Sequence, residues 1–170
     1  PFIGASTGYS NFIGLTDMYG SQAACKENKI LESIEVLMKE DYRVLKYGFL
    51  KSELDRAKTA LLERMERASN EVDKTESSRY ASEYVSNFLH HDPIPGAKRE
   101  YTLAKKLIDG FYVNEINELA KGWITPENFV AIVMAPEKEG VNVPTQEQIL
   151  KVITDKKLKD VEPYVDTYKE

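Results

Sequence analysis

The chain has 170 residues, of which 42% are hydrophobic and 30% are charged, and its formal net charge is −5. These values fit one ordinary globular domain with a core of its own, or two very small ones. The net negative charge argues against a nucleic-acid partner, which would favour a basic surface. Peptides and small molecules remain compatible with it.

The beginning of the chain and its single cysteine limit the choice of compartment very little. The first residues, PFIGASTGYSNF, are typical of the middle of a folded segment, so we expect the chain to be a piece of a longer protein. No apolar run has the length of a membrane helix and there is no signal peptide, so any targeting signal is expected upstream. Cys25 is expected to be a small buried hydrophobe; a reactive nucleophile is the alternative, although no nearby base is indicated.

Two strands and one helix are predicted in the first 48 residues. Residues 2–9 and 17–25 read as strands, and residues 11–16 connect them. Apolar residues then recur at steps of three and four, namely Ile30, Ile34, Leu37, Met38, Tyr42 and Leu45. This spacing predicts an amphipathic helix packed on the sheet of the two strands, with Gly48 as its C-terminal cap.

Residues 51–89 form a long helical tract that is interrupted by the polar stretch DKTESSR. The pattern predicts two helices that meet at a break; one helix with a solvent-exposed middle is the alternative. Thr75 and Ser77 are the candidate N-caps of the restarted helix. The tract ends at a run of helix breakers, Pro93, Pro95 and Gly96.

Shorter elements are predicted after the prolines. Helices are expected over residues 98–108 and 113–121. Thr125 is expected to cap one turn, with Pro126 at its first helical position. Residues 129–135, FVAIVMA, form a continuous apolar run that is β-branched in part and predicts a strand buried on both faces.

The last 35 residues contain a loop, a helix and a charged tail. PEKEGVNVP, residues 136–144, is predicted to be a loop. Thr145 and Gln148 have the spacing of a capping box for the helix that follows. The tail over residues 156–170 is rich in charge and is predicted to mark a domain edge or a linker.

The two histidines of the chain, His90 and His91, are adjacent and are followed by Asp92. A hydrolytic zinc site needs about three converging side chains and one open position. Adjacent residues on a helix point about 100° apart, so the two histidines cannot serve one ion from a regular helix. We interpret the triplet as polar residues at a helix end before Pro93; a histidine–aspartate metal site is the alternative.

Other catalytic patterns are missing from the sequence. It contains no H-x-x-E-H, no G-x-S-x-G, no P-loop and no G-x-G-x-x-G. A solvated helix face paired with basic residues is the interpretation of five glutamates, and a catalytic carboxylate pair is the alternative. The glutamates are Glu53, Glu63, Glu66, Glu71 and Glu76, and the basic residues are Lys51, Arg56, Arg64 and Lys74. The tyrosines are interpreted as core residues, with a peptide groove as the alternative. The sequence therefore assigns no catalytic, cofactor-binding or metal-ligating residue.

Six short phrases stand in one order between residues 47 and 145: GF..SEL.RAK, DKTES, FL...PIPG, EY.L.K, N.LAK.WIT..N and APEK.GV..PT. Together they resemble the second domain of a half-unit in the pitrilysin/insulinase family of zinc peptidases, and the large bacterial members most closely. One position departs from the family pattern, because Leu50 stands where a threonine would start a helix. We expect the capping box with Glu53 to be lost and Ser52 to take over as the cap.

The resemblance implies an α+β fold with an antiparallel-rich sheet and helices on one face, as in mitochondrial-processing-peptidase-like metalloenzymes. It implies a single C-terminal-type domain over residues 1–170. Two such domains form a half, and two halves close around an unfolded peptide. The family binds zinc in the first domain of its active half, through H-x-x-E-H and a distal glutamate. That motif is absent here, and no position matches the arginine and tyrosine with which the opposite half assists substrate binding.

The expected function follows from this resemblance. The chain would be a non-catalytic domain of a zinc-dependent metalloendopeptidase, inactive by itself, and would form part of the peptide-enclosing chamber. Zinc is expected in the parent's catalytic domain and no cofactor in this fragment. The expected partners are other domains or the opposite half, an extended peptide, and a second copy of the fragment. A bacterial periplasm or cell envelope is expected from the relatives, with the cytoplasm as the alternative.

Two other functions remain open at this point. In the first, the parent is an inactive relative that serves as a scaffold or assembly subunit. H-x-x-E-H upstream in the parent gene would favour the peptidase, and its absence would favour the scaffold. An independent helical binding module is disfavoured by the strand predicted over residues 129–135.

Overall fold

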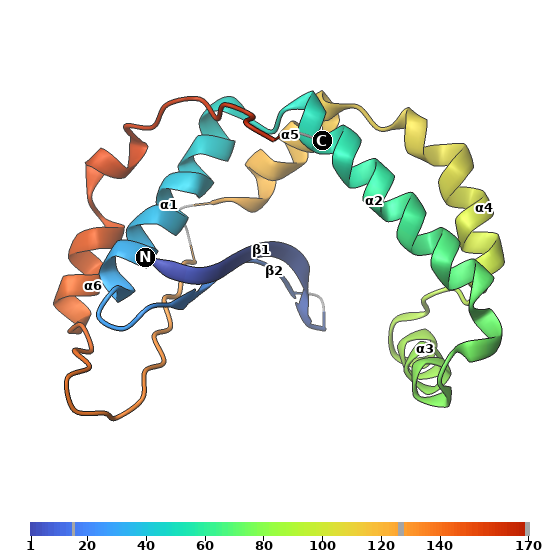
Figure 1. The fold of residues 1–170 in the computed structure, drawn as a ribbon, viewed down its shortest axis with the longest axis horizontal. Helices are drawn as coiled ribbons and strands as arrows, with labels where there is room; N and C mark the ends of the chain where they lie inside the picture. The colour runs from blue at the N-terminus through green and yellow to red at the C-terminus, as the bar shows by residue number, and fades with distance from the viewer. Residues whose placement is uncertain (15, 126–127, 169–170) are drawn as a thin grey trace. The chain divides into compact units, whose positions relative to one another are not determined.

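The computed structural model describes residues 1–14, 16–125 and 128–168. The chain divides into two compact units, residues 1–49 with 114–170 (unit 1) and residues 50–113 (unit 2). Helices predominate and the sheet is antiparallel, which confirms the predicted α+β class. The elements in chain order are β1 (Phe2–Ile13), β2 (Thr16–Cys25), α1 (Ile30–Tyr47), α2 (Lys51–Asn70), η1 (Val72–Lys74), α3 (Ser77–His90), α4 (Ala97–Leu107), η2 (Ile108–Gly110), α5 (Val113–Trp123), α6 (Gln146–Ile153) and η3 (Lys156–Lys159) (Figure 1).

The two predicted strands form a hairpin in unit 1. β1 and β2 pair antiparallel, with Tyr9 opposite Tyr19. β1 continues to Ile13, so part of the expected connection belongs to the strand. Gly14 has a φ of 57°, a left-handed value that glycine adopts without steric cost at a turn. The other residue of the turn, Leu15, lies outside the described residues.

Helix α1 is the element on which unit 1 is assembled. It packs against β2, as predicted, and also against α6 and η3; Figure 1 shows α6 beside α1. Ser33 of α1 is only 1% exposed. Its hydroxyl donates to the carbonyl of Lys29 at 2.7 Å, so this buried polar group is satisfied. Gly48 ends the helix at a φ of 73°, which confirms the predicted cap.

The charged tail packs against α1 through two apolar side chains. Leu158 and Val161 are 2% and 5% exposed and are among the most buried residues of the described chain. Arg43 Nε donates to the carbonyl of Glu162 at 2.9 Å, and the Tyr47 hydroxyl donates to that of Val161 at 3.0 Å. The first part of the tail is therefore no linker, because its charged sequence contains the two apolar residues that are buried. The alternative prediction, a domain edge, stays open.

Two asparagine side chains hold the connections of unit 1. Asn28 Nδ2 donates to the carbonyl of Gly140 at 3.0 Å, and its Oδ1 accepts from the N–H of Asn142 at 2.7 Å. Asn117 on α5 acts in the same way, since its Oδ1 accepts from the N–H of Phe49 at 2.7 Å and its Nδ2 donates to the same residue's carbonyl at 3.3 Å. Each amide thus replaces backbone hydrogen bonds that these loops lack.

The apolar run over residues 129–135 is not a buried strand, so this prediction was wrong. The run has no regular secondary structure, and neither β1 nor β2 pairs with it. Val130, Ile132 and Met134 are 77%, 79% and 91% exposed. Apolar, β-branched composition favours a strand, but a strand also has to pair with a neighbouring edge, and the run pairs with neither open edge of the β1–β2 hairpin.

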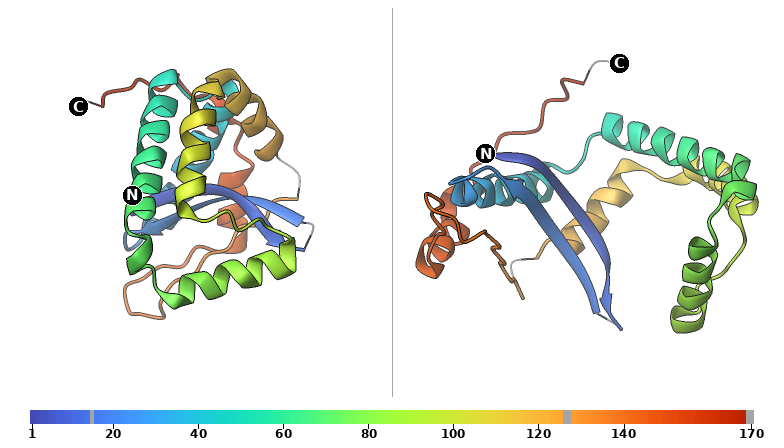
Figure 2. Two further views of the ribbon diagram at one scale, coloured as in Figure 1. Left: turned by 90° about the vertical axis from the view of Figure 1, so that its right-hand side faces the viewer. Right: turned by 60° about the horizontal axis from the view of Figure 1, so that its bottom comes forward.

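Unit 2 is built on the pairing of α2 with α4. The two helices run side by side in both views of Figure 2. The Tyr101 hydroxyl of α4 donates to Glu66 Oε1 of α2 at 2.9 Å, and Lys58 Nζ donates to the carbonyl of Phe111 at 2.8 Å. Ile108, in the turn that follows α4, is 7% exposed.

The helix ends of unit 2 confirm the predicted break and correct the predicted caps. α2 and α3 are separate helices, but α3 has Glu76 at its N-cap position, with no side-chain cap bond, in place of Thr75 or Ser77. α2 begins after Leu50, and Glu53 still accepts from the Leu50 N–H at 2.8 Å. Half of the capping box therefore survives, because this half needs only a backbone donor at the first position.

Two helix caps were predicted near the C-terminus, and the structure tests one of them. The predicted box of Thr145 and Gln148 is confirmed, with both reciprocal bonds present, at 3.3 and 2.9 Å. The turn expected after Thr125 involves residues 126 and 127, which lie outside the described residues.

Truncating the tail's main contact is expected to destabilise unit 1. Leu158→Ala removes a side chain that is 2% exposed, so we expect it to lower the free energy of unfolding by about 2–4 kcal/mol. Leu119→Ala, at a position 50% exposed in the same unit, is the matched control and should cost much less. Denaturant melts followed by circular dichroism measure both, and equal losses would show that the tail does not contribute to the core.

A pair of glycine substitutions tests the contact with Asn117. Gly48→Ala places a Cβ against the Asn117 side chain at a φ of 73°, so both strain and collision oppose it. We expect a loss of more than about 1 kcal/mol in unfolding free energy. Gly122→Ala, inside α5 with open space around the new Cβ, should be neutral or stabilising. A Gly48→Ala variant as stable as the parent would show that neither the positive φ nor the contact with Asn117 requires glycine at this position.

Candidate functional site

The histidine pair lies at the C-terminal end of α3. His90 is the last residue of the helix, and His91 follows in the left-handed region at φ 59° and ψ 26°. The adjoining carboxylate is already engaged, since the Ser86 hydroxyl donates to Asp92 Oδ2 at 2.6 Å. Asn87 Nδ2 donates to the Asp92 carbonyl at 2.6 Å. The triplet therefore forms the end of a helix, as its interpretation from the sequence expected.

Potential metal ligands do not converge within the described part of the chain. No group of three or more His, Cys, Asp or Glu side chains lies close enough there to hold one ion. In the same residues, no helix is long and apolar enough to cross a membrane. Cys25, the single thiol, is half-buried at the end of β2.

The best-defined polar cluster joins β2 to α1. The Tyr19 hydroxyl donates to Asp41 Oδ1 at 2.7 Å, and the Ser21 hydroxyl donates to the same oxygen at 3.0 Å. Tyr19 and Ser21 lie two residues apart on β2, so both side chains point to the face that α1 covers. Asp41 lies four residues after Leu37, on the apolar face of the helix. That position was the signal in the sequence that an acidic side chain faces the sheet, and it was overlooked.

The electrostatics of this cluster are those of a partly desolvated carboxylate. Burial raises the pKa of Asp41, and the hydrogen bonds from Tyr19 and Ser21 oppose that rise. Burial also raises the pKa of Tyr19, and its bond to Asp41 acts in the same direction. The arrangement attaches the sheet to the helix, since both hydroxyl groups of β2 are bonded to the carboxylate of α1.

A second tyrosine pairs with an acid near the hairpin turn. The Tyr9 hydroxyl donates to Asp17 Oδ2 at 2.7 Å, and this bond raises the pKa of Tyr9. The Tyr9 ring stacks on Trp123 of α5, with ring centroids 4.6 Å apart and an angle of 17° between the planes. This contact places the end of α5 against the hairpin and uses two aromatic side chains for packing.

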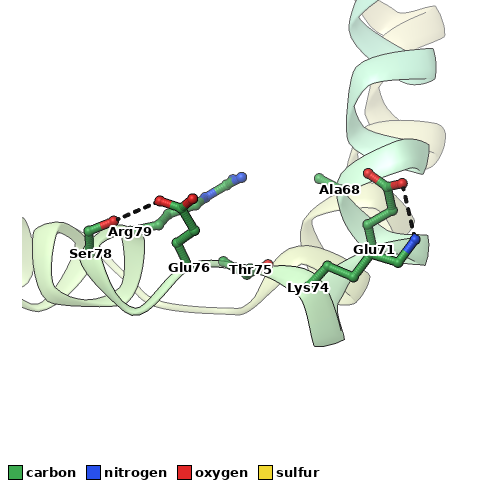
Figure 3. A pocket seen from close by; sticks show the side chains of 7 residues that line it. All are labelled: Ala68, Glu71, Lys74, Thr75, Glu76, Ser78 and Arg79. Atoms are coloured by element: carbon green, nitrogen blue, oxygen red, sulfur yellow. Dashed lines mark hydrogen bonds and ion pairs between the residues drawn. The ribbon is translucent and has the colours of Figure 1, made fainter.

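A shallow polar pocket of about 320 Å³ lies at the α2–α3 bend of unit 2 (Figure 3). Its charged groups are paired locally, since Lys74 lies 3.7 Å from Glu71 and the Ser78 hydroxyl donates to Glu76 at 3.4 Å. Arg79 also lies 3.7 Å from Glu83. Such exposed pairs are worth little energetically, and the pocket offers no converging catalytic groups. The residues that line it are Ala68, Glu71, Lys74, Thr75, Glu76, Ser78 and Arg79.

The Asp41 cluster has a testable dependence on pH. A carboxyl pKa raised by folding stabilises the protein fully only below the unfolded pKa of about 3.9, and this contribution is lost as the pH rises through the folded pKa. Asp41→Asn removes the titration, so its unfolding free energy relative to the parent should improve from pH 4 to pH 7. Chemical melts of both proteins at several pH values measure this difference. Parallel pH profiles would contradict it.

The comparisons with known proteins agree with the resemblance found in the motifs. No protein-family model matches the chain. A "Zinc protease PQQL-like" protein of Arabidopsis thaliana is 26% identical over 95 residues, which are 56% of this chain and 10% of that protein. The crystal structure of the first half of the periplasmic protease PqqL from Escherichia coli matches with a TM-score of 0.68 at 16% identity, over 97% of this chain and 36% of that one.

The chain thus spans about one tenth of its curated relative and about a third of the structural relative. The sequence match and the fold match lead to the same group of enzymes, although each covers only a part of the proteins compared. In sequence and in fold, the chain resembles the zinc proteases of the pitrilysin family.

Proposed function

We propose that this chain is a non-catalytic domain of a zinc-dependent metalloendopeptidase of the pitrilysin/insulinase family. In this role it forms part of the wall of the peptide-enclosing chamber and contacts neighbouring domains of the same protein. Zinc and the hydrolytic step belong to another domain of the parent.

The observation that carries the proposal is the fold match to the first half of a protease, which extends over 97% of this chain. Sequence similarity to a zinc protease supports it independently. The distribution of potential ligands adds a third argument. The sequence has two histidines, which are adjacent at the end of α3, and it lacks H-x-x-E-H. A zinc hydrolase needs about three converging ligands, which a neighbouring domain would supply.

The surface of the chain fits a domain that contacts others. Large apolar side chains are exposed on both units, and on α3 they are adjacent or one turn apart on the helix. Tyr84, Val85, Phe88 and Leu89 are 62%, 56%, 81% and 61% exposed. Contiguous apolar surface of this kind marks interaction sites in folded proteins. Peptide contacts in the chamber would use the same chemistry, apolar pockets with backbone pairing at a sheet edge.

The proposal predicts that the isolated chain has neither zinc nor peptidase activity. After dialysis against trace zinc, elemental analysis should find clearly less than one zinc per chain, because no three ligands converge among the residues that the structure describes. A quenched fluorescent peptide should not be cleaved above the buffer blank. The double variant His90→Ala/His91→Ala is the control and should match the parent in both assays. Stoichiometric zinc that the double variant loses, or cleavage by the parent chain, would contradict the proposal.

The alternative function is that of a scaffold or assembly domain in an inactive relative. The parent gene distinguishes the two, because a working peptidase carries H-x-x-E-H in the domain that precedes this one. If the parent carries the motif, replacing its glutamate with glutamine should abolish cleavage by the whole protein and leave its folding intact.

A further inference from the structure

The run over residues 129–135 is an exposed link within unit 1. It has no regular secondary structure, and five of its seven residues are exposed. Val130, Ile132 and Met134 are 77%, 79% and 91% exposed. Residues 129–137 form no backbone hydrogen bond to any other residue that the structure describes. The run therefore adds little to the packing of unit 1.

The chain beyond this link, residues 136–168 (the C-terminal segment), is bound to unit 1 by contacts of its own. Near its start, Lys138 Nζ lies 2.7 Å from Glu27 Oε1. Asn28 donates to the carbonyl of Gly140 at 3.0 Å and accepts from the N–H of Asn142 at 2.7 Å. Both partner side chains come just before α1 begins, so the C-terminal segment is attached at the N-terminal end of that helix.

The C-terminal segment also reaches the other end of α1. Its helices α6 and η3 both pack on α1, and α6 lies beside α1 in Figure 1. Leu158 and Val161 are 2% and 5% exposed. Arg43 Nε donates to the carbonyl of Glu162 at 2.9 Å, and the hydroxyl of Tyr47, the last residue of α1, donates to that of Val161 at 3.0 Å. The contacts therefore extend along the whole helix.

We propose that α1 is a docking surface for the C-terminal segment, and that residues 129–135 are a proteolytic cleavage site whose two products stay together. Cleavage hydrolyses one peptide bond of the run. The hydroxyl of water joins the carbonyl carbon, and its hydrogen joins the amide nitrogen. None of the contacts named above involves the run, so the cut leaves each of them in place.

The composition of the run favours one class of endopeptidase. Elastase-type enzymes have a small pocket for the residue that precedes the scissile bond. The run offers four residues that fit such a pocket, namely Val130, Ala131, Val133 and Ala135. Exposed irregular backbone is a preferred place for proteolytic nicking, whereas the same residue types in a helix are protected until the helix opens locally.

Limited proteolysis of the whole 170-residue chain tests both parts of the proposal. Brief digestion with elastase should cut first within residues 129–135, as mass spectrometry of the two products would show. A denaturing gel should separate the products, and gel filtration at micromolar concentration should elute them together at the volume of the uncut chain. A first cut elsewhere, or products that elute apart, would overturn the proposal.

A leucine pair tests whether the contacts with α1 hold the products together. Leu158→Ala removes a side chain that is 2% exposed, and should raise the dissociation constant of the cut complex at least about tenfold. Leu150→Ala removes the same atoms from a side chain of α6 that is 50% exposed, and should raise it less than about threefold. Sedimentation of the cut proteins over a dilution series measures both. Equal constants for the two variants would overturn the docking surface.

A milder variant covers the case in which Leu158→Ala fails to fold, which circular dichroism of the uncut chain would show. Tyr47→Phe deletes only the hydroxyl that is bonded to Val161, and should raise the dissociation constant about two- to tenfold. An unchanged constant would overturn the contribution of this end of α1. The tests involve neither zinc nor catalysis by this chain, so their results are independent of the proposed function.

Discussion

The packing of β2, α6 and η3 around α1 is the constraint on which unit 1 depends. A two-stranded hairpin is at best marginally stable in water, so the sheet persists because a helix covers part of one face. The contact between β2 and α1 includes two hydrogen bonds. The hydroxyl groups of Tyr19 and Ser21 donate to the half-buried carboxylate of Asp41. The tail also packs on α1 through η3, and its Leu158 and Val161 are 2% and 5% exposed. The helix is thus covered by segments from both ends of the chain, which explains why unit 1 is discontinuous in sequence.

The loops and the tail of unit 1 are held in place by hydrogen bonds from single side chains. Asn28 and Asn117 each use both ends of a carboxamide to bind loop backbone, and Arg43 and Tyr47 donate to the carbonyls of the tail. Such bonds contribute about 0.5–1.5 kcal/mol each, but leaving their partners unpaired would cost more. Few residues are fully buried, so each of these bonds has a large share in the stability of its unit.

The absence of a convergent ligand set in the described chain and the abundance of exposed apolar side chains fit one physical picture. Both suit the proposed role, in which the domain contributes surface rather than chemistry. Its α3 helix and its 129–135 segment expose large apolar side chains, as interaction surfaces do in folded proteins. The likeness to zinc proteases in sequence and fold supports the proposal that the chain is a domain of such a protease.

The sequence by itself determined the local elements, because their signals are local. Helical periodicity located α1 and the α2–α3 break, Gly48 marked a cap, and the spacing of Thr145 and Gln148 marked a capping box. The ordered motifs were enough to suggest the family and the α+β class. Only the tertiary structure decided what depends on distant partners. It showed that FVAIVMA is not a strand, because a strand has to pair with a neighbouring edge and this run pairs with neither edge of the β1–β2 hairpin. It also revealed that the charged tail hides Leu158 and that Asp41 faces Tyr19, since burial and hydrogen bonding depend on residues far apart in sequence.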